Sequence, residues 1–369
     1  MRPPPLPERL LLGPGPSNVA APVREALARP LIGHLDPAFL ELLDDVQERL
    51  RGVFRTTQPR TLPLSGTGSA GMEACLVNLL EPEDAAVVGV AGIFGERMAE
   101  IVERAGAHAV RVEAPMGEIV PPERLCRAID LHRPRVVSLV HAETSTGVCQ
   151  PIAEVAAHAR ARGSLVVLDC VTSLSGMDVR VDDWQIDAAY SGTQKCLSCP
   201  PGLSPVSFGP RALERIEGRA QPVSSWYLDV TLLGRYFGRE RMYHHTAPVS
   251  MIVALDEALA RIDDEGLEPR FERHRTAHAR LVEGLAQLGF GMLVAPEHQL
   301  PMLSAVLPPY RDEAQVRRDL LERHQIEIGG GLGKLAGQIW RIGLMGENAR
   351  PEAVDRLLEA LRSLDPPRR

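Results

Sequence analysis

Lysine is nearly absent from this chain of 369 residues. Lysine and arginine together number 41, and two of them, Lys195 and Lys334, are lysines, which leaves 39 arginines. A bias in genome composition explains this imbalance best. It still limits the chemistry, because a reaction that needs a side-chain primary amine has two candidates.

Long apolar runs are also missing. No stretch approaches the roughly 20 residues that a membrane-spanning helix requires. The opening MRPPPLPERL resembles neither a signal peptide nor a transit peptide, and the closing SLDPPRR lacks a peroxisomal signal. The net charge of −7 argues against nucleic acid or an anionic membrane as the main partner. We therefore expect a cytoplasmic protein.

Cysteine is scarce beyond the middle of the chain, since all six cysteines lie at or before Cys199. Four of them fall in apolar or helical patterns typical of buried side chains. Cys196 and Cys199 form a single CxxC, which could be half of a redox or zinc site. No second CxxC or histidine pair at zinc spacing accompanies it, so we predict no metal. The neighbours His244 and His245 would point in opposite directions on a strand and chelate poorly.

What the sequence does have is a regular alternation of short apolar runs and helical patterns between about residues 61 and 209. Several runs lack polar alternation, as expected for strands covered on both faces. We predict a three-layer α/β/α domain around a mainly parallel seven-stranded sheet. The predicted strands are Thr61–Leu64, Ala85–Val90, Ala109–Glu113, Val136–Val140, Leu165–Asp169, Ala188–Tyr190 and Val206–Phe208, and the helices include Ala70–Leu80, Gly95–Arg104, Pro122–Leu131 and Ile152–Arg162.

The pattern changes after about residue 250 and predicts a smaller C-terminal α+β domain. Its expected helices are Ser250–Asp264, Glu268–Leu288 and Pro351–Leu364, and its expected strands are Met292–Ala295, Leu303–Leu307, Ile326–Ile328 and Ile339–Ile342. Three consecutive glycines, 329–331, predict a flexible loop.

A glycine-rich turn, LSGTGSAG (64–71), joins a predicted strand to a predicted helix. Glycines and a helix amino terminus together favour an anion, so the turn could hold a phosphate. The same letters also fit the dinucleotide fingerprint GxGxxG, which would indicate a nicotinamide-dependent oxidoreductase. That fingerprint calls for an acidic residue at the end of the next strand. The next predicted strand, Ala85–Val90, runs into Ala91-Gly92-Ile93 and has no carboxylate at its end, which argues against the dinucleotide interpretation.

Two further polar residues follow buried strands. Asp169 ends one strand, and Lys195 closes the turn after another. Taken singly, they could be a turn or cap aspartate and a surface lysine. Ligands in such sheets bind at the carboxyl ends of the strands, where these residues can meet the glycine turn. A phosphate cradle, an acid and an amine are what pyridoxal 5′-phosphate (PLP) requires.

Many ordered segments also resemble one family over nearly the whole chain. The chain is similar to the alanine–glyoxylate and serine–pyruvate aminotransferases, which belong to class V of the fold type I PLP-dependent transferases. The segments are LLGPGPSNV (11–19), IGHLDP (32–37), SGTGSAGMEA (65–74), GIFGER (92–97), HAETSTGV (141–148), LDCVTS (168–173), SGTQK (191–195), MYHHTAPV (242–249), IEIGGGLG (326–333) and WRIGLMG (340–346).

This resemblance implies a role for each matching residue. Lys195 would form the Schiff base and move the proton between the substrate Cα and the cofactor, and Asp169 would pair with the pyridine nitrogen. Arg341 would hold the substrate carboxylate. The other expected cofactor contacts are Val171 and Phe94 on the two ring faces, Thr144 at the ring 3-oxygen, Thr67, Gly68, Ser69 and Gln194 at the phosphate, and Tyr243 and Thr246 at the phosphate of the partner subunit.

Three positions depart from the common family pattern. Phe94 stands where tryptophan is usual, Ser69 where histidine is common and Thr144 where serine is common. A smaller ring at Phe94 should hold the cofactor less tightly, although stacking survives. These departures leave the catalytic set complete but weaken any transfer of substrate preference.

The resemblance implies transfer of an amino group from alanine, and as an alternative serine, to glyoxylate or pyruvate. Ureidoglycine–glyoxylate transamination is a second possibility on the same scaffold. Cysteine desulfurases share the fold but need a nucleophilic cysteine in the carboxyl-terminal part, which this chain lacks. We also expect a homodimer with shared active sites. The expected parts are an N-terminal segment that packs on the small domain or the dimer partner (1–20), a large PLP-binding domain (21–265) and a small C-terminal domain (266–369).

Overall fold

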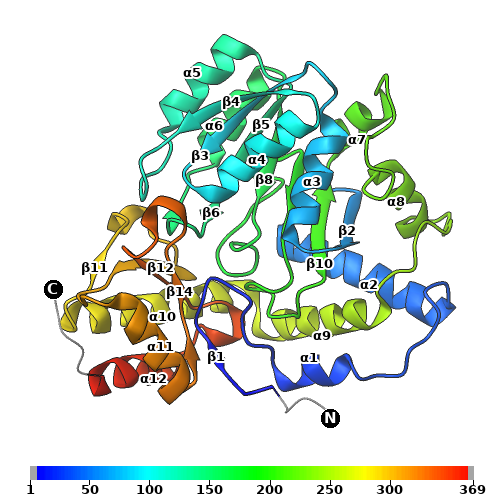
Figure 1. Cartoon of the computed structure of the whole chain (residues 1–369). Helices are drawn as coiled ribbons and strands as arrows, with labels where there is room; N and C mark the ends of the chain where they lie inside the picture. Colours follow the sequence, from blue (N-terminus) through cyan, green and yellow to red (C-terminus); the bar gives the residue numbers. More distant parts are fainter. Residues whose placement is uncertain (1–5, 365–369) are drawn as a thin grey trace.

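A seven-stranded sheet forms the centre of the larger part of the molecule (Figure 1). The structure, a computed structural model, describes residues 6–364. In spatial order the strands are β2 (Arg60–Ser65), β10 (Leu203–Phe208), β9 (Ala188–Tyr190), β8 (Leu165–Asp169), β5 (Val136–Val140), β3 (Ala85–Val90) and β4 (His108–Glu113). Strand β10 runs antiparallel to both neighbours, and the other pairs are parallel. The predicted mainly parallel seven-stranded sheet is confirmed.

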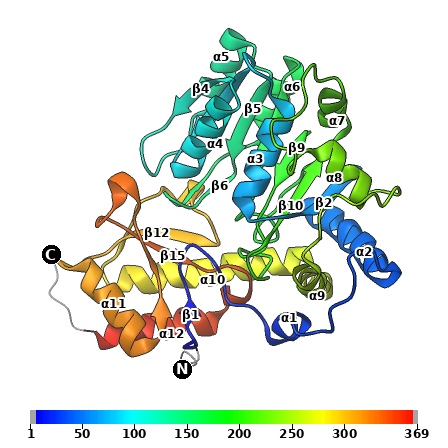
Figure 2. The same ribbon diagram turned by 45° about the vertical axis from the view of Figure 1, so that its right-hand side comes forward.

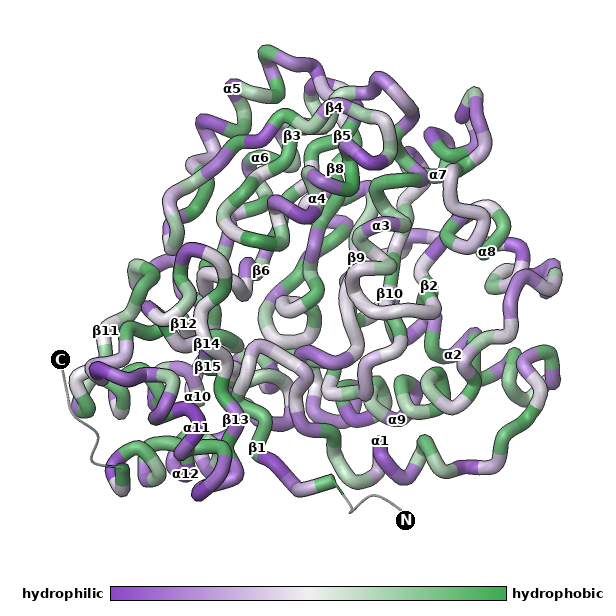
Figure 3. The backbone as a smooth tube through the Cα atoms, in the orientation of Figure 1, coloured by the Kyte–Doolittle hydropathy of each residue, from purple (hydrophilic) through white to green (hydrophobic). Residues whose placement is uncertain are grey.

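Helices cover both faces of this sheet. Helices α3 (Gly68–Leu79) and α4 (Ile93–Arg104) pack together on one face, and α5 (Pro122–His132) and α6 (Ala153–Ala161) pack together on the other (Figures 1 and 2). Every residue of β5, β8 and β10 is buried as a result. Figure 3 shows these central strands as mostly apolar, with polar residues gathered on the outer helices. Helix α2 (Pro37–Phe54) packs on β2, and α1 (Ala21–Ala26), α7 (Pro210–Glu217) and α8 (Val230–Phe237) complete this part.

A second, antiparallel sheet lies at the other end of the molecule. Its strands are, in order, β11 (Gly291–Met292), β12 (Leu303–Leu307), β15 (Trp340–Gly343) and β14 (Gly329–Gly330). They share a separate hydrophobic core with α10 (Leu267–Gln287), α11 (Glu313–His324) and α12 (Pro351–Ser363). Helices α9 (Val249–Glu265) and α10 follow each other along the bottom of both parts (Figure 1). Short elements complete the order: β6 (Ala142–Glu143), β7 (Val148–Cys149), and the 3-10 helices η1 (Pro296–His298), η2 (Gly333–Leu335) and η3 (Gly346–Asn348).

The segment after residue 325 differs from the sequence expectation. The predicted strand Ile326–Ile328 is divided: β13 (Ile326–Glu327) pairs with β1 (Leu10–Leu11), whereas Gly329–Gly330 pairs with β15. The chain changes partner at Gly329, where an added Cβ would lie 2.6 Å from Pro14. The glycines therefore serve close packing within a strand, and the flexible loop predicted at 329–331 is wrong.

The expected boundaries after residues 20 and 265 remain predictions. Residues 1–5 and 365–369, which fall in the expected first and last parts, lie outside the described residues. Across residues 6–364, no helix is long and apolar enough to cross a membrane.

Candidate active site

One cavity opens at the carboxyl edge of the seven-stranded sheet. It brings together most of the residues predicted for the site, although they are far apart in the sequence. Its lining comprises Thr67, Gly68, Ser69, Met72, Phe94, Arg97, Ala142, Thr144, Asp169, Val171, Thr172, Gln194 and Lys195.

The glycine-rich turn leaves the amino terminus of α3 open towards this cavity. Thr67 is the N-cap residue, and its side chain makes no capping hydrogen bond. Gly66 has a φ of +133°, a backbone conformation that favours glycine. At Gly68 an added Cβ would lie 2.9 Å from a methyl group of Val171. The helix thus presents unpaired N–H groups and the positive end of its dipole, which together suit an anion.

The amide of Gln194 adds an unsatisfied polar group to the same wall. Its Oε1 atom is buried and has no hydrogen-bond partner among the described residues. A buried polar atom without a partner is uncommon in native proteins and calls for a ligand or another explanation. Rotation about the last side-chain torsion would present the amide N–H groups to an anion at α3.

Asp169 stands at the end of β8 with both carboxylate oxygens engaged. The backbone N–H of Val171 donates to Oδ1 over 2.9 Å, and the Tyr190 hydroxyl donates to Oδ2 over 2.7 Å. Burial raises the pKa of Asp169 to about 6, and these two hydrogen bonds act against the shift. The group is therefore mostly ionised at neutral pH, as a partner of a protonated ring nitrogen must be.

Lys195 reaches the cavity beneath the N-terminal segment of the chain. Its Nζ donates to the carbonyl oxygen of Pro14, and Ser17 Oγ donates to the Lys195 carbonyl oxygen over 3.0 Å. Gly15 has a φ of +105°, a backbone conformation that favours glycine, and an added Cβ there would lie 2.5 Å from Nζ. Burial lowers the pKa of Lys195 to about 8, and the charge of Arg341 acts in the same direction. This lysine loses its proton far more readily than a solvated one.

The neighbouring helix α4 has a closed amino terminus. Glu143 Oε2 accepts from the N–H groups of Phe94 and Gly95 over 3.1 and 3.3 Å, and Ser145 Oγ accepts from the N–H of Ile93 over 2.9 Å. Ser145 in turn donates its N–H and its hydroxyl to Glu143 Oε1. Of the two helix ends near the cavity, α3 is therefore the one left open for an anion, and α4 is fixed with Phe94 against the cavity.

Arg341 lies on β15 of the smaller sheet, and its side chain reaches the turn that follows β6. Its Nε donates to the Gly330 carbonyl oxygen over 2.8 Å, and its Nη1 donates to the Thr144 carbonyl oxygen over 3.5 Å. The residue is 7% exposed, and Glu143 and Lys195 lie close enough to interact with its charge. A guanidinium has five N–H donors, so donors remain for a carboxylate.

Tyr243 and Thr246 lie away from the cavity of their own chain. Both are exposed, and Tyr243 lies against His34, with 5.5 Å between the ring centroids. The structure brings nine of the other predicted residues together in the cavity and places Arg341 within reach of Thr144, but it leaves these two on the surface.

The two cysteines of the CxxC motif and the two adjacent histidines are all buried. Cys196 and Cys199 are buried, and burial raises the pKa of Cys196 to about 11 and that of Cys199 to about 12, which disfavours a reactive thiolate. The expectation that His244 and His245 point apart is wrong. They lie in a loop rather than a strand, and their Nδ1 atoms are 2.8 Å apart. No group of three or more potential metal ligands occurs in the part of the chain that the structure describes.

Sequence reasoning missed several neighbours of the reactive groups. Pro14 and Gly15 touch Lys195, and Tyr190 holds Asp169. Arg97 lines the cavity with its guanidinium carbon 5.2 Å from the centroid of the Phe94 ring. The turn GPGP and the position of Tyr190 at a strand end were visible signals, but neither pattern says which residue it will contact.

Comparison with known proteins gives a consistent result. The model of the family "Aminotransferase class-V" matches residues 26–345. An alanine–glyoxylate aminotransferase of Drosophila melanogaster is 38% identical over 362 residues, which are 96% of this chain and 92% of the relative. A crystal structure of an alanine–glyoxylate aminotransferase from Nostoc sp. has a TM-score of 0.97 and 47% identity, and the match covers 98% of this chain and 97% of that one. A ureidoglycine–glyoxylate aminotransferase structure from Bacillus subtilis has a TM-score of 0.96 and 38% identity, with 98% and 94% covered.

Proposed function

Because this chain belongs to the class V aminotransferase family, we propose that it uses PLP to move an amino group from a small amino acid to glyoxylate or pyruvate. Alanine is the expected donor and serine the alternative. The observation that carries the proposal is that Lys195, Asp169 and the open amino terminus of α3 line one cavity. A nicotinamide-dependent oxidoreductase is set aside, since the family is one of aminotransferases.

The residues of the cavity fit PLP. The phosphate would lie at the open end of α3, held by Thr67, Gly68, Ser69 and Gln194. The Gln194 amide without a hydrogen-bond partner and the positive end of the helix dipole both favour an anion there. Phe94 and Val171 line the cavity together, as two residues that flank a ring would. Thr144 would reach the ring 3-oxygen, and Asp169 would keep the ring nitrogen protonated. When bound, the protonated ring withdraws electrons from the substrate Cα.

Lys195 has two tasks in this proposal, covalent attachment of the cofactor and proton transfer at the substrate Cα. Both tasks need a neutral amine, and the pKa of about 8 leaves a useful neutral fraction near pH 7. The Pro14 carbonyl oxygen accepts a hydrogen bond from Nζ and so holds the free amine at the cavity. Arg341 would hold the substrate carboxylate and so fix which Cα bond faces Lys195.

A homodimer with shared sites is part of the proposal. Tyr243 and Thr246 would complete the phosphate site of the partner subunit, which accounts for their exposure in a single chain. Large apolar side chains in the three segments 31–35, 226–227 and 242–243 are also exposed, as is typical of an interface. They are Leu31, Ile32, Leu35, Trp226, Tyr227, Met242 and Tyr243. The expected cytoplasmic location stays a prediction.

Transamination of ureidoglycine is a second candidate, since a relative of that name from Bacillus subtilis is 36% identical over 97% of this chain. One experiment tests both. The PLP-loaded protein would be mixed with alanine, serine or ureidoglycine while the cofactor absorbance is followed. We expect alanine to discharge it fastest. A portion treated with borohydride before any donor should carry the label on the peptide of Lys195.

A Lys334→Arg variant is the matched control for this experiment, because Lys334 is exposed in η2 and outside the cavity. It should keep both the label and the donor reaction. In the wild-type protein, label on the Lys334 peptide would refute the central proposal. Faster discharge by ureidoglycine would leave the cofactor assignment intact and replace the donor.

A further inference from the structure

Tyr190 donates a hydrogen bond to Asp169 from the neighbouring strand. The two residues are direct Cα partners on the parallel strands β9 and β8. The Tyr190 hydroxyl donates to Asp169 Oδ2 over 2.7 Å. Tyr190 is completely buried and Asp169 is 3% exposed, so water does not compete for this bond.

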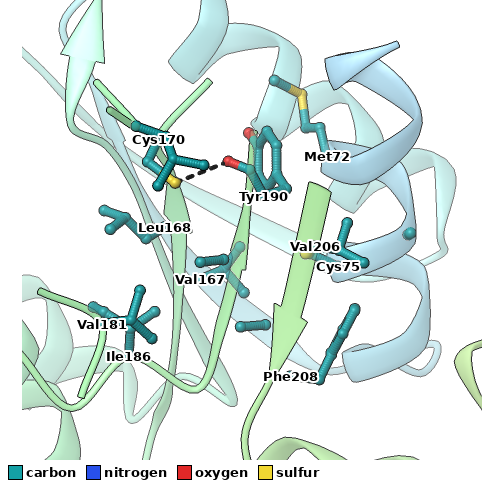
Figure 4. Close-up of a cluster of buried hydrophobic side chains, with 14 of the residues drawn as sticks. Met72, Cys75, Val167, Leu168, Cys170, Val181, Ile186, Tyr190, Val206 and Phe208 are labelled. Atoms are coloured by element: carbon teal, nitrogen blue, oxygen red, sulfur yellow. Dashed lines mark hydrogen bonds between the residues drawn. The ribbon is translucent and has the colours of Figure 1, made fainter. Parts of the chain in front are cut away.

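The Tyr190 ring is packed so that its hydroxyl has little freedom. Figure 4 shows it beside Met72 from α3 and among the apolar side chains of the core. At Gly71 an added Cβ would lie 2.9 Å from Tyr190 Cβ, so the helix approaches the strand closely. The Val171 N–H holds the other oxygen of Asp169. The carboxylate is therefore fixed in direction by two donors on opposite oxygens.

We propose that Tyr190 is a positioning residue that keeps Asp169 ionised and aimed at the ring nitrogen of the cofactor. The inference rests on the proposed function, because Asp169 has this task only if PLP is bound. Tyr190 itself does not line the cavity and acts through Asp169.

The charges around Asp169 support this assignment. The titratable side chains that act on it are Tyr190, Glu143, Lys195, Cys75 and Cys170. Lys195 favours the ionised carboxylate and Glu143 opposes it. Burial raises the pKa of Cys75, of Cys170 and of Tyr190 well above their ordinary values, so all three stay protonated at neutral pH. Tyr190 is thus a permanent donor, and it counters the burial that raises the pKa of Asp169 to about 6.

The test is a Tyr190→Phe variant loaded with PLP that carries 15N in its ring. Without the phenol, the pKa of Asp169 should rise by about one unit. In a pH titration, cofactor affinity should then fall on acidification from a pH about one unit higher than in wild type. Near neutral pH the 15N resonance should shift towards that of an unprotonated ring, because a more basic carboxylate draws the shared proton from the ring nitrogen. Near neutral pH, kcat should fall up to about tenfold with little change in KM.

Two further variants make the result decisive. Tyr310→Phe removes a buried hydroxyl from the core of the small sheet and should leave the 15N titration unchanged. Fluorotyrosine at position 190 keeps the packing but donates a stronger hydrogen bond. The loss of cofactor affinity on acidification should therefore move to lower pH. This second variant preserves the test if Tyr190→Phe does not fold.

The inference is overturned if Tyr190→Phe lowers only the unfolding temperature while the 15N titration matches wild type. An Asp169→Asn protein separates this failure from failure of the proposed function. If Asp169→Asn changes the ring resonance and Tyr190→Phe does not, the role of Tyr190 alone is wrong. If Asp169→Asn leaves ring protonation unchanged, the proposed role of Asp169 is wrong as well.

Discussion

Arg341, the residue proposed to hold the substrate carboxylate, is positioned by two backbone carbonyl groups. The carbonyl oxygens of Gly330 on β14 and of Thr144 in the turn after β6 accept two of its N–H groups. An arginine held in this way loses little side-chain entropy when a carboxylate binds, which favours a bidentate contact.

We therefore predict different effects for two replacements of Arg341. Arg341→Lys keeps the charge but loses the planar fork and should mainly raise KM. Arg341→Ala leaves the substrate carboxylate unpaired and should cost about 2–5 kcal/mol in kcat/KM. Cofactor content should stay normal. Comparing alanine with a simple amine that lacks a carboxylate gives the measurement, because the amine should lose nothing further.

The control for Arg341 is Arg280→Lys, which changes an exposed arginine paired with Asp355 on α12. It should leave both rates unchanged. Equal losses for alanine and for the amine in Arg341→Ala would mean that this residue supports the fold rather than the substrate.

Asp169 and Lys195 could be predicted from sequence because each follows a buried strand, and strand ends of a parallel sheet share one edge. The acceptor of Lys195 Nζ could not. Pro14 lies 181 positions away, and nothing in a turn of glycine and proline specifies that distant contact. The raised pKa of Asp169 was equally hidden, since it depends on burial in the finished fold.

Helix α4 shows how a separate segment can determine what a helix end does. Gly92 precedes the helix and offers no capping side chain, so Glu143 and Ser145 supply the acceptors. An added Cβ on Gly92 would lie 2.3 Å from Ser145 Oγ and 2.6 Å from the Glu143 carboxyl carbon, so glycine is needed for this approach. The segment HAETSTGV therefore closes α4 and places Phe94.

We predict that Glu143→Gln loosens this end of α4. Its amide N–H2 cannot accept from all the N–H groups that the carboxylate satisfies, and a buried unsatisfied donor costs about 1–3 kcal/mol. The free energy of unfolding should fall by about that amount, and PLP should bind more weakly as Phe94 shifts. Urea unfolding and equilibrium cofactor titration would measure the two effects.

Glu100→Gln serves as the control on the same helix, because Glu100 is exposed and pairs with Arg104. Its stability should change by no more than about 0.5 kcal/mol. Unchanged cofactor affinity in a less stable Glu143→Gln protein would show that the cap supports the helix but not the ring.

At the level of elements, most strands of the large sheet were predictable because strands covered on both faces are continuous apolar runs. The predicted range of β10, Val206–Phe208, was too short, because the strand spans Leu203–Phe208. Ser204 and Pro205 interrupt its apolar pattern and hid its beginning. The predicted Met292–Ala295 is limited to Gly291–Met292, the residues that face Leu307 and Val306 on β12. Register with a partner strand, which local pattern does not contain, sets such limits.

The N-terminal segment joins the two parts of the whole molecule. It pairs with β13 through β1 and then passes over Lys195. The Leu12 carbonyl oxygen accepts from Gly343 N–H on β15, and the Leu11 carbonyl oxygen accepts from Asn348 Nδ2. Its path therefore links the position of the Lys195 amine to β15, the strand that carries Arg341. This arrangement could be recognised only in the folded chain.

Assembly of two chains is the last prediction, and it concerns Tyr243 and Thr246. If these residues serve the partner's phosphate site, a Tyr243→Ala/Thr246→Ala chain and a Lys195→Ala chain should each fail alone but complement each other. In a mixed dimer, the intact Lys195 of one chain meets the intact Tyr243 and Thr246 of the other. One complete site forms, and the second site carries all the defects.

The measurement uses the two variants with different affinity tags, expressed together and purified through both tags. We expect each mixed dimer to bind one PLP tightly and to recover about half of the wild-type activity per dimer, and sedimentation should show tighter dimers with PLP than without it. A mixture of wild type with the Lys195→Ala chain provides the reference for a dimer with one reactive lysine. If Tyr243 and Thr246 acted within their own chain, the mixed dimer would have no complete site and would stay inactive. A fully active, PLP-saturated monomer would contradict the shared site directly.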